Sequence, residues 1–312
     1  MVTSNQLNRR GFLAAAMGAG ALQAGAGKME FCVFSKHLHF LPWAEMAAAA
    51  KEMGFDGVDL TVRKGGHVTP ERVAEDLPKA AAAIRAAGLR LTMITTDIGD
   101  MTTPHTEPVL RAAKQAGVTH YRWDGFKYKD GVSLPEQLKE MAPRVKDLAA
   151  FNKELGLCAM YHTHSGPGRV GASQWDLWML LRDLDRRYVS FNFDVAHATI
   201  EGGLGGWLHS TKLAMPHMGG IALKDFKWGR GPNGKWRVDW CPIGDGMVQT
   251  REFLRMVKAG GFAGPVQVHY EYDLGGADKG ATKITMPKAQ VLAVMKKDLD
   301  ALRSLSMDAG WV

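Results

Sequence analysis

The strongest constraint on the fold is a regular alternation of short apolar runs with longer segments of helical periodicity. Short runs that are apolar throughout are typical of parallel strands covered on both faces. We expect strands at residues 30–35, 57–62, 90–95, 119–123, 157–161, 189–193, 220–223 and 266–270. Helical periodicity predicts helices that include residues 43–53, 70–87, 135–155, 175–184 and 250–259. Strands and helices that alternate in this way predict a closed (β/α)8 TIM barrel of the α/β class.

The residues that end the predicted helices support this alternation. Glycine directly follows Met53, Ala87 and Leu155, and glycine readily adopts the left-handed conformation that is common after a helix. The main alternative is an open, doubly wound sheet, which often carries a glycine-rich turn after its first strand. Residues 34–39 stand at that place and contain no glycine. We therefore expect one barrel domain over residues 27–312.

Composition excludes several other classes of protein. The chain has 312 residues, of which 46% are hydrophobic and 23% charged, so it has enough apolar surface for a core and is not expected to be disordered. Cys32, Cys158 and Cys241 show no C-x-x-C spacing. They can form neither a disulfide framework nor a cysteine-based zinc site.

Residues 1–26 have the features of an export signal rather than of a folded segment. Arg9 and Arg10 precede a run rich in alanine and glycine, and residues 24–26 provide small side chains for cleavage. Paired arginines at this place are typical of twin-arginine signals, which the export machinery for folded proteins reads. The alternative is a short membrane anchor, although the run is too short and too glycine-rich to span a bilayer well. We expect a periplasmic or secreted protein without stable membrane contact.

The charge of the chain points to no macromolecular partner. Residues 1–26 carry two arginines and no acidic residue, so their removal lowers the formal charge from +7 by two, to +5. The remaining basic residues are mixed with acidic ones, and this balance predicts no nucleic-acid partner. The sequence is compatible with an oligomer.

Polar and ionisable side chains gather where the predicted strands end. In a TIM barrel the active site lies at the carboxyl ends of the strands and in the loops that follow them. The residues at these places include Lys36, His37, His39, Arg63, His67, Asp97, Arg122, His162, His164, Asp194, His197, Lys224, Asp225, His269 and Glu271. Because side chains alternate along a strand, Gln267, His269 and Glu271 are expected to share one face.

Asp194 and Glu271 are the most informative of these residues. Each follows a strongly apolar strand, where a carboxylate without a partner would be costly to bury. A divalent ion would remove that cost, and carboxylates with imidazoles suit Mn²⁺, Co²⁺, Mg²⁺ or Zn²⁺. The alternatives are structural: a single histidine at a strand end is more often a hydrogen-bonded group than a ligand, and Lys224 with Asp225 would form an ion pair at the barrel rim.

The order of these residues resembles that of the xylose-isomerase-like TIM barrels, the sugar phosphate isomerase/epimerase superfamily. This superfamily also contains inosose dehydratases and nucleases of the endonuclease IV type. The resemblance rests on Asp194-x-x-His197, Leu223-Lys224-Asp225 and Glu271 after three successive strands. Two sequence motifs of its isomerase/epimerase branch are similar to Tyr161-His162-Thr163-His164 and Gly65-Gly66-His67-Val68. The likeness covers roughly residues 29–305.

The resemblance implies a divalent metal ion held by side chains of strands five to eight. Carried over to this sequence, the ligands are His162, Asp194 and Glu271, and His197 is the histidine beside the metal that touches substrate. Two positions depart from the family, which usually has glutamate in place of His162 and histidine in place of Ala222. These departures predict weaker metal binding, a shift of the ion toward His164 or His269, or no ion.

The resemblance also implies an enzyme, an isomerase, epimerase or carbon–oxygen lyase that acts on a sugar. Glu271, or a histidine near it, would remove a proton next to a carbonyl, His197 would take part in catalysis, and Lys224 would stabilise the developing oxyanion. Expected substrate contacts come from Lys36, Arg63, His67, His164 and His269. Residues 228–240 are expected to form a glycine-rich loop that acts as a lid. The three reactions share the first proton abstraction, so the sequence leaves open which of them occurs.

The predicted export narrows the substrate, and two other functions remain as alternatives. An exported member is expected to act on a free sugar, a keto sugar or a glycoside, because sugar phosphates are cytoplasmic metabolites. A sugar-binding protein without catalysis is the main alternative, since Ala222 can ligate nothing. An endonuclease IV-like nuclease fits less well, because it would need more carboxylates at the strand ends and a basic groove.

Overall fold

The computed structural model describes residues 28–311, so the predicted signal at residues 1–26 lies outside the described part. The strands of the barrel are β1 (Phe31–Phe34), β2 (Gly57–Val62), β3 (Arg90–Thr96), β4 (His120–Trp123), β5 (Cys158–His162), β6 (Val189–Asp194), β7 (Met218–Leu223) and β10 (Val266–Val268). They close in the order β1-β10-β7-β6-β5-β4-β3-β2, and every neighbouring pair is parallel. The prediction of a (β/α)8 barrel is confirmed.

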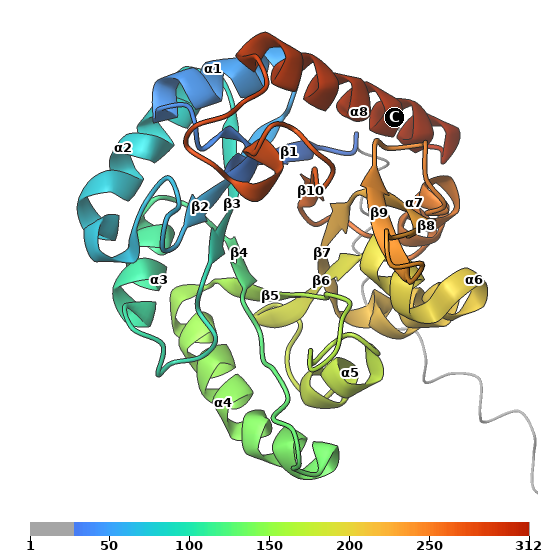
Figure 1. Ribbon diagram of the computed structural model, residues 1–312. Helices are drawn as coiled ribbons and strands as arrows, with labels where there is room; N and C mark the ends of the chain where they lie inside the picture. Colours follow the sequence, from blue (N-terminus) through green and yellow to red (C-terminus); the bar gives the residue numbers. More distant parts are fainter. Residues whose placement is uncertain (1–27, 312) are drawn as a thin grey trace, which may run out of the picture.

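The described residues form eight α-helices. These helices surround the strands in the view along the barrel (Figure 1). They are α1 (Trp43–Met53), α2 (Val73–Ala86), α3 (Thr106–Gln115), α4 (Leu134–Leu155), α5 (Trp175–Leu181), α6 (Val195–Ala214), α7 (Thr250–Ala259) and α8 (Lys288–Asp308). Helix α8 packs against both α7 and α1 and so completes the ring. Short 3-10 helices, η1 (Ser35–Leu38), η2 (Pro70–Arg72), η3 (Met215–His217) and η4 (Ala277–Lys279), lie in the connections.

The predicted strand and helix ends are largely those of the structure, for local reasons. Gly54 and Gly156 end α1 and α4 with φ of 97° and 68°, the left-handed conformation that a side chain disfavours. The strand β2 is buried at every position, as expected for a strand with covered faces. Hydrophobic burial therefore fixes the strands, and glycine ends two of the helices that connect them.

Two segments differ from the sequence expectation. The stretch expected to be a lid loop is a β-hairpin, in which β8 (Asp225–Arg230) pairs with β9 (Trp236–Cys241) in antiparallel fashion. Its strands are labelled β8 and β9 in Figure 1. The residues after Asp194, for which the sequence indicated no helix, begin helix α6 directly. Both differences bring regular structure close to the carboxyl ends of β6 and β7.

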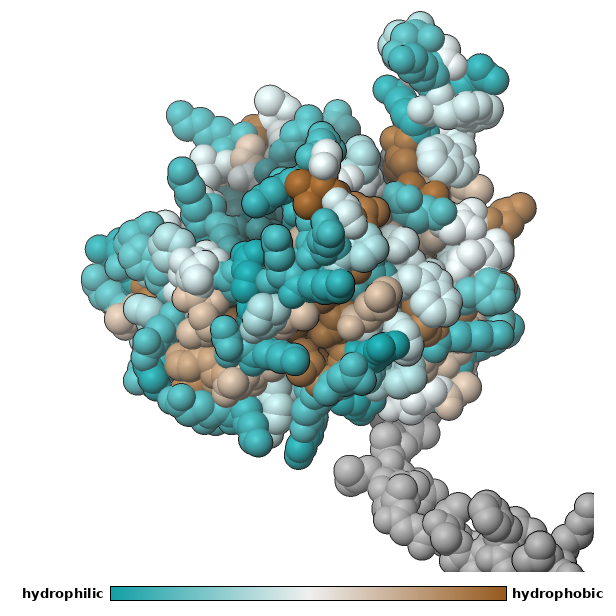
Figure 2. Space-filling view, turned by 90° about the horizontal axis from the view of Figure 1, so that it is seen from below, coloured by the Kyte–Doolittle hydropathy of each residue, from teal (hydrophilic) through white to brown (hydrophobic). Residues whose placement is uncertain are grey.

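The outer surface is that of a helical ring facing water. On the face shown in Figure 2, hydrophobic residues form small patches among hydrophilic ones, as is usual for helices that bury one side against strands. Within residues 28–311, no helix is both long and apolar enough to cross a bilayer.

Candidate active site

The structure brings the predicted polar residues together at the carboxyl end of the barrel. His162 and Asp194 are the last residues of β5 and β6, whereas Lys224 and His269 directly follow β7 and β10. All four are buried. The mouth of the barrel therefore holds a group of ionisable side chains, which is where active sites lie in this fold.

Asp194 is the centre of this group, and the turn from β6 into α6 fixes its position. Its Oδ1 accepts a hydrogen bond from the N–H of His197 at 3.0 Å, which caps α6, and its own N–H donates to Thr163 Oγ1 at 2.9 Å. Asp194 Oδ2 is thereby left to face the neighbouring strand ends, where it lies 3.2 Å from His162 Nε2.

Lys224 neutralises Asp194 inside the barrel. The distance from its Nζ to Asp194 Oδ2 is 3.1 Å, and the side chain of Lys224 is only 3% exposed. Burial alone would raise the pKa of Asp194, but the Lys224 ammonium and the hydrogen bond from His197 hold this pKa below its ordinary value. Asp194 is therefore a charged carboxylate at neutral pH.

His197 holds the ammonium of Lys224 in place. Its Nε2 lies 2.7 Å from Lys224 Nζ, and its Nδ1 lies 2.8 Å from Ser165 Oγ. Burial, with a further contribution from Lys224, lowers the pKa of His197 well below its ordinary value, so its neutral ring accepts from the ammonium at Nε2. Both ring nitrogens have partners within the protein, and the ring stacks on His164 at 3.9 Å between centroids. The structure thus gives His197 a positioning role.

Lys224 keeps one donor for a ligand. An ammonium has three N–H groups, and Asp194 Oδ2 and His197 Nε2 take two of them at 3.1 and 2.7 Å. The remaining charged neighbour, Glu271 Oε1, lies 3.9 Å away, which is too long for a hydrogen bond. The third N–H of Lys224 is therefore available to an oxygen of a bound molecule.

His269 offers a ring nitrogen without a partner. Its Nε2 lies 3.2 Å from Gln267 Oε1, an acceptor, so this nitrogen carries the proton. Its Nδ1 is buried and has no hydrogen-bond partner among the described residues. An orphaned, buried lone pair is costly in a folded protein unless a ligand satisfies it.

The residues present fit a divalent metal ion. Ligand atoms of His162, Asp194 and His269 all lie within 4.8 Å of one another, and two imidazoles with one carboxylate suit ions such as Zn²⁺ or Mn²⁺. Burial lowers the pKa of His162 and of His269 well below the ordinary value, so both rings are neutral, as ligation requires. Ala222, in register with Asp194 and Gln267, adds no ligand.

Glu271 lies outside this group of candidate ligands. Its Oε1 is 3.5 Å from Lys36 Nζ and 3.9 Å from Lys224 Nζ, and its side chain is 28% exposed. The structure therefore places Glu271 between two ammonium groups at the mouth of the site. His269, which the sequence suggested as a substrate contact, lies instead with His162 and Asp194.

Of the other predicted substrate contacts, His67 and His164 have hydrogen-bond partners within the protein, whereas Arg63 has none among the described residues and faces the site. His67 is tied into the loop after β2, with Nε2 3.2 Å from Leu41 O and Nδ1 3.2 Å from Ser35 Oγ. Arg63 faces the site, because its guanidinium carbon lies 5.6 Å from the centre of the Phe34 ring, beside His269. His164 donates from Nδ1 to Ser165 O at 2.7 Å, and burial lowers its pKa to about 4.

Three residues that shape the site received no role from the sequence, although Arg122 and Gln267 were noted at the strand ends. Gln267 orients His269, Ser165 orients His197, and Arg122 of β4 reaches the same aromatic ring as Arg63. An arginine inside a predicted strand between Tyr121 and Trp123 was the available signal for Arg122. The other two could be assigned only from tertiary contacts.

Asp225 organises the base of the hairpin and does not pair with Lys224. Its carboxylate accepts hydrogen bonds from four backbone N–H groups, those of Phe226, Gly244, Gly246 and Val248, at 2.9 to 3.1 Å. These bonds place β9 so that Lys224 Nζ lies 4.8 Å from the centre of the Trp240 ring. The hairpin thus covers Lys224 with an aromatic face, an arrangement that suits both the cation and a sugar ring.

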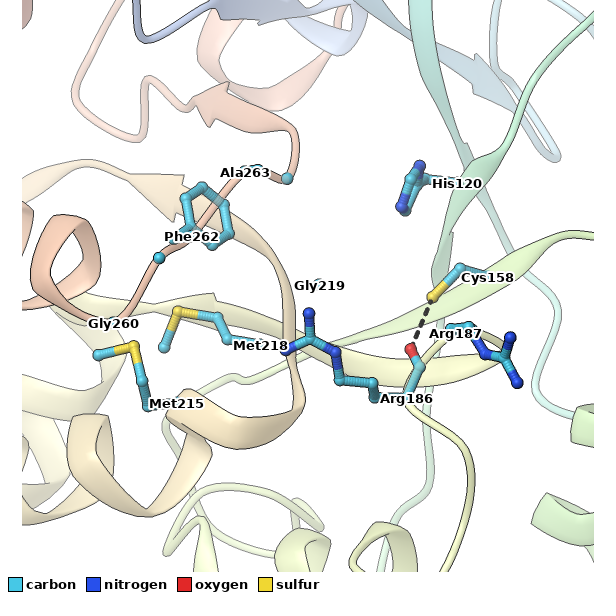
Figure 3. Close-up of a pocket in the computed structure, with 12 residues that line it drawn as sticks. His120, Cys158, Arg186, Arg187, Met215, Met218, Gly219, Gly260, Phe262 and Ala263 are labelled. Atoms are coloured by element: carbon cyan, nitrogen blue, oxygen red, sulfur yellow. Dashed lines mark hydrogen bonds between the residues drawn. The ribbon is translucent and has the colours of Figure 1, made fainter. Parts of the chain in front are cut away.

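The hollow shown in Figure 3 lies at the other end of the barrel. It is lined by His120 and Met218, which begin β4 and β7, by Cys158, and by residues 260–264 before β10. Its one marked contact is the weak bond from Cys158 Sγ to Arg186 O. Because the ionisable cluster lies at the carboxyl ends, we assign the candidate active site there and not to this hollow.

The chain belongs to the xylose isomerase-like TIM barrel family, which it matches over residues 47–304. No curated protein sequence matches the chain. Membership in this family agrees with the closed barrel and with the resemblance found in the sequence.

Solved structures with the same fold share little sequence with this chain. The 3-keto-D-glucoside 4-epimerase YcjR from E. coli superposes with a TM-score of 0.65 and 15% identity, over 89% of this chain and 100% of that one. The probable 3-DHS dehydratase AsbF from Bacillus anthracis gives 0.65 and 17% identity, over 87% and 99%. The IOLI protein, solved with a bound zinc atom, gives 0.68 and 14% identity, over 88% and 98%.

Proposed function

We propose that the protein is a metal-assisted sugar isomerase, epimerase or carbon–oxygen lyase that removes a proton next to a carbonyl. The observation that carries the proposal is the placement of His162, Asp194 and His269 within 4.8 Å of one another, beside Lys224 and Glu271. The epimerase and the dehydratase of the same fold support it by analogy. A periplasmic or secreted location, proposed from residues 1–26, favours a free or keto sugar or a glycoside.

A divalent ion held by His162, Asp194 and His269 would polarise the carbonyl and acidify the neighbouring C–H group. Glu271 is the base in this proposal, because its carboxylate is partly exposed at the mouth and belongs to no helix cap or buried network. The Nζ atoms of Lys36 and Lys224 lie 3.5 and 3.9 Å from its Oε1 and hold this carboxylate at the mouth of the site. The free N–H of Lys224 donates to the oxygen on which negative charge develops.

The outcome of the reaction depends on where the proton returns. Return to the opposite face of the same carbon gives an epimer, and return to the neighbouring carbon gives an isomer. Loss of a β-substituent from the same intermediate gives an elimination product. His164, with an unprotonated Nε2 near the stacked ring of His197, is a second group able to carry the proton.

One residue favours a different function. Ala222 stands in register with Asp194, and the side chain there supplies no ligand. A barrel that binds a sugar without converting it is therefore the second candidate.

The test combines metal analysis with turnover on keto sugars and their glycosides, with products identified by NMR. Wild-type activity should disappear on chelation and return with a divalent ion. Glu271→Gln should abolish turnover and retain the ion, whereas Asp194→Asn should lose both. Turnover that survives Glu271→Gln would remove the base from the proposal, and a wild type that binds sugars but converts none would establish the second candidate.

A further inference from the structure

Three cationic side chains, each in or directly after a different strand, converge on one aromatic ring at the mouth of the barrel. The Nζ of Lys36 and the guanidinium carbons of Arg63 and Arg122 lie 5.6, 5.6 and 5.8 Å from the centre of the Phe34 ring. Lys36 follows β1, Arg63 follows β2, and Arg122 is part of β4. We call Lys36, Arg63 and Arg122 the cationic cluster.

The two guanidinium groups of the cluster lack partners. Among residues 28–311, neither Arg63 nor Arg122 makes a side-chain hydrogen bond or an ion pair within 4.0 Å. Both are half-buried. Guanidinium groups in that position usually have carboxylate partners, because partial burial of an unpaired charge costs free energy.

The nearby acids do not neutralise the cluster. Asp59 is buried, accepts both of its close hydrogen bonds from Thr95 at 2.8 and 2.9 Å, and burial raises its pKa to about 7. Glu271 is shared between Lys36 and Lys224. Asp124 is exposed on the rim. The guanidiniums of Arg63 and Arg122 therefore repel each other without a neutralising carboxylate among the described residues. Burial and the charge of Arg63 lower the pKa of Arg122.

The cluster adjoins the candidate metal ligands. The Phe34 ring lies 4.8 Å from the His269 ring, between centroids, with an angle of 30° between the planes. On the other side, Glu271 links Lys36 to Lys224 through contacts of 3.5 and 3.9 Å. A single sugar can therefore reach both the proton-transfer groups and the cationic cluster.

We propose that the cationic cluster binds an anionic group, a carboxylate or a phosphate, carried by the sugar substrate. The inference rests on the proposed function, because it assigns one end of that substrate. Unpaired guanidiniums donate well-oriented, charge-assisted hydrogen bonds to either group. The substrate class is accordingly an acidic sugar rather than a neutral one. A carboxylate agrees with the proposed export, whereas a phosphate ester would weigh against it.

The test measures equilibrium binding, so it does not depend on turnover. Isothermal titration at low ionic strength compares D-glucose, D-glucuronate and D-glucose 6-phosphate, which share a ring and differ at one carbon. At least one anionic probe should bind at least about tenfold more tightly than glucose. Stronger binding of glucuronate assigns a carboxylate, and stronger binding of the phosphate ester assigns a phosphate.

Matched variants locate the effect. Arg63→Met and Arg122→Met keep the aliphatic stem and should each abolish the preference for the anion. Arg85→Met, which removes an arginine of α2 on the outer surface, should retain it. Arg122→Met should also unfold at the same or a higher temperature than the wild type, because it removes an unpaired, partly buried charge.

Three results would overturn the proposal: equal affinity for the three probes, no binding of any of them, or a preference that persists in both methionine variants. A marked loss of stability in Arg122→Met would assign this arginine a structural role instead. Anion binding without any proton transfer would contradict only the proposed reaction, so the two failures are distinguishable.

Discussion

At the scale of single residues, the site is a balance between one carboxylate and the cations around it. Asp194 faces both the Lys224 ammonium, 3.1 Å away, and the imidazoles of His162 and His269. An ammonium and a divalent ion repel each other at such distances even in a partly polar interior. Lys224 is therefore expected to weaken metal binding while it supplies the donor that the reaction needs.

Lys224→Met separates these two effects. We expect the affinity for Mn²⁺ or Zn²⁺ to rise at least about tenfold, because a competing charge at Asp194 is removed, while turnover falls. Competition with a chelating dye measures the affinity. Lys64→Met, which changes an exposed lysine, serves as the control. Unchanged affinity in Lys224→Met would show that the ammonium and the ion do not share Asp194.

Buried neutral histidines make stability depend on pH. His37 accepts from the N–H of Tyr270 at Nε2, 3.1 Å away, and its Nδ1 lies 3.2 Å from Ala277 O, so a proton on Nε2 would break the first bond. Burial and the nearby Lys36 lower the pKa of His37 well below its ordinary value. Below about pH 6.5 the unfolded chain binds a proton at this residue that the folded chain does not, so stability falls as pH falls.

Urea unfolding between pH 7 and 5, with chelator present, should show this decline. The free energy of unfolding should change less steeply with pH in His37→Gln than in the wild type, by up to about 1.4 kcal/mol per pH unit. His209→Gln, at an exposed position of α6, should keep the wild-type slope. Equal slopes in the wild type and His37→Gln would mean that His37 titrates normally in the folded protein.

At the scale of elements, the hairpin of β8 and β9 depends on one carboxylate. The Asp225 carboxylate accepts hydrogen bonds from four backbone N–H groups, of residue 226 and of residues 244–248. Strand β9 carries the Trp240 ring that covers Lys224. The sequence suggested a loop here, because the glycines of residues 229–234 obscure the strand pattern on either side. Pairing between β8 and β9, rather than local propensity, forms the strands.

Asp225→Asn should loosen this element without unfolding the barrel. The amide loses one acceptor oxygen, which leaves two of the four N–H groups without partners, at a cost of about 1–3 kcal/mol each at most. Hydrogen exchange should accelerate at residues 244–248 and in β9. Asp245→Asn, an exposed change in the same loop, is the control. Unaltered exchange in Asp225→Asn would show that other contacts hold the hairpin.

The last barrel strand shows why part of the site could not be predicted. Alternation placed Gln267, His269 and Glu271 on one face, but β10 ends at Val268 and the N–H of Tyr270 donates to His37. Gln267 and His269 do lie together, since their side chains are hydrogen-bonded, and His269 joins the candidate ligands. Glu271, beyond the end of the strand, lies instead between two lysines. The hydrogen bond from Tyr270 to His37 joins residues 233 positions apart, a contact that strand alternation does not predict.

At the scale of the whole molecule, the fold was predictable because it depends on repetition. Apolar runs of strand length, helical periodicity and glycine after helices recur along the chain, and no single error would change the barrel. The carboxyl ends of the strands then identify the active end. The partners within the site, such as Lys224 with Asp194 rather than Asp225, required the structure.

The predicted export signal is tested on the full-length chain. Arg9 and Arg10 changed together to lysine should block export, because the twin-arginine machinery reads this pair and the barrel does not include it. Fractionation of cells that express the protein measures the effect. Lys28→Arg, just beyond the predicted signal, should be exported as the wild type. Normal periplasmic accumulation of the double-lysine variant would contradict the twin-arginine assignment.

The central claim is that this barrel removes a proton next to a carbonyl, and deuterium exchange in D₂O tests it most directly. The protein loaded with a divalent ion is incubated with acidic and neutral keto sugars, and NMR follows the C–H signals beside the carbonyl. With the wild type, deuterium should enter at this carbon, or at the neighbouring carbon where an isomer takes up the proton, and with Glu271→Gln it should enter at neither. Turnover that leaves deuterium at neither this carbon nor its neighbour, in product and in recovered substrate, would contradict the claim.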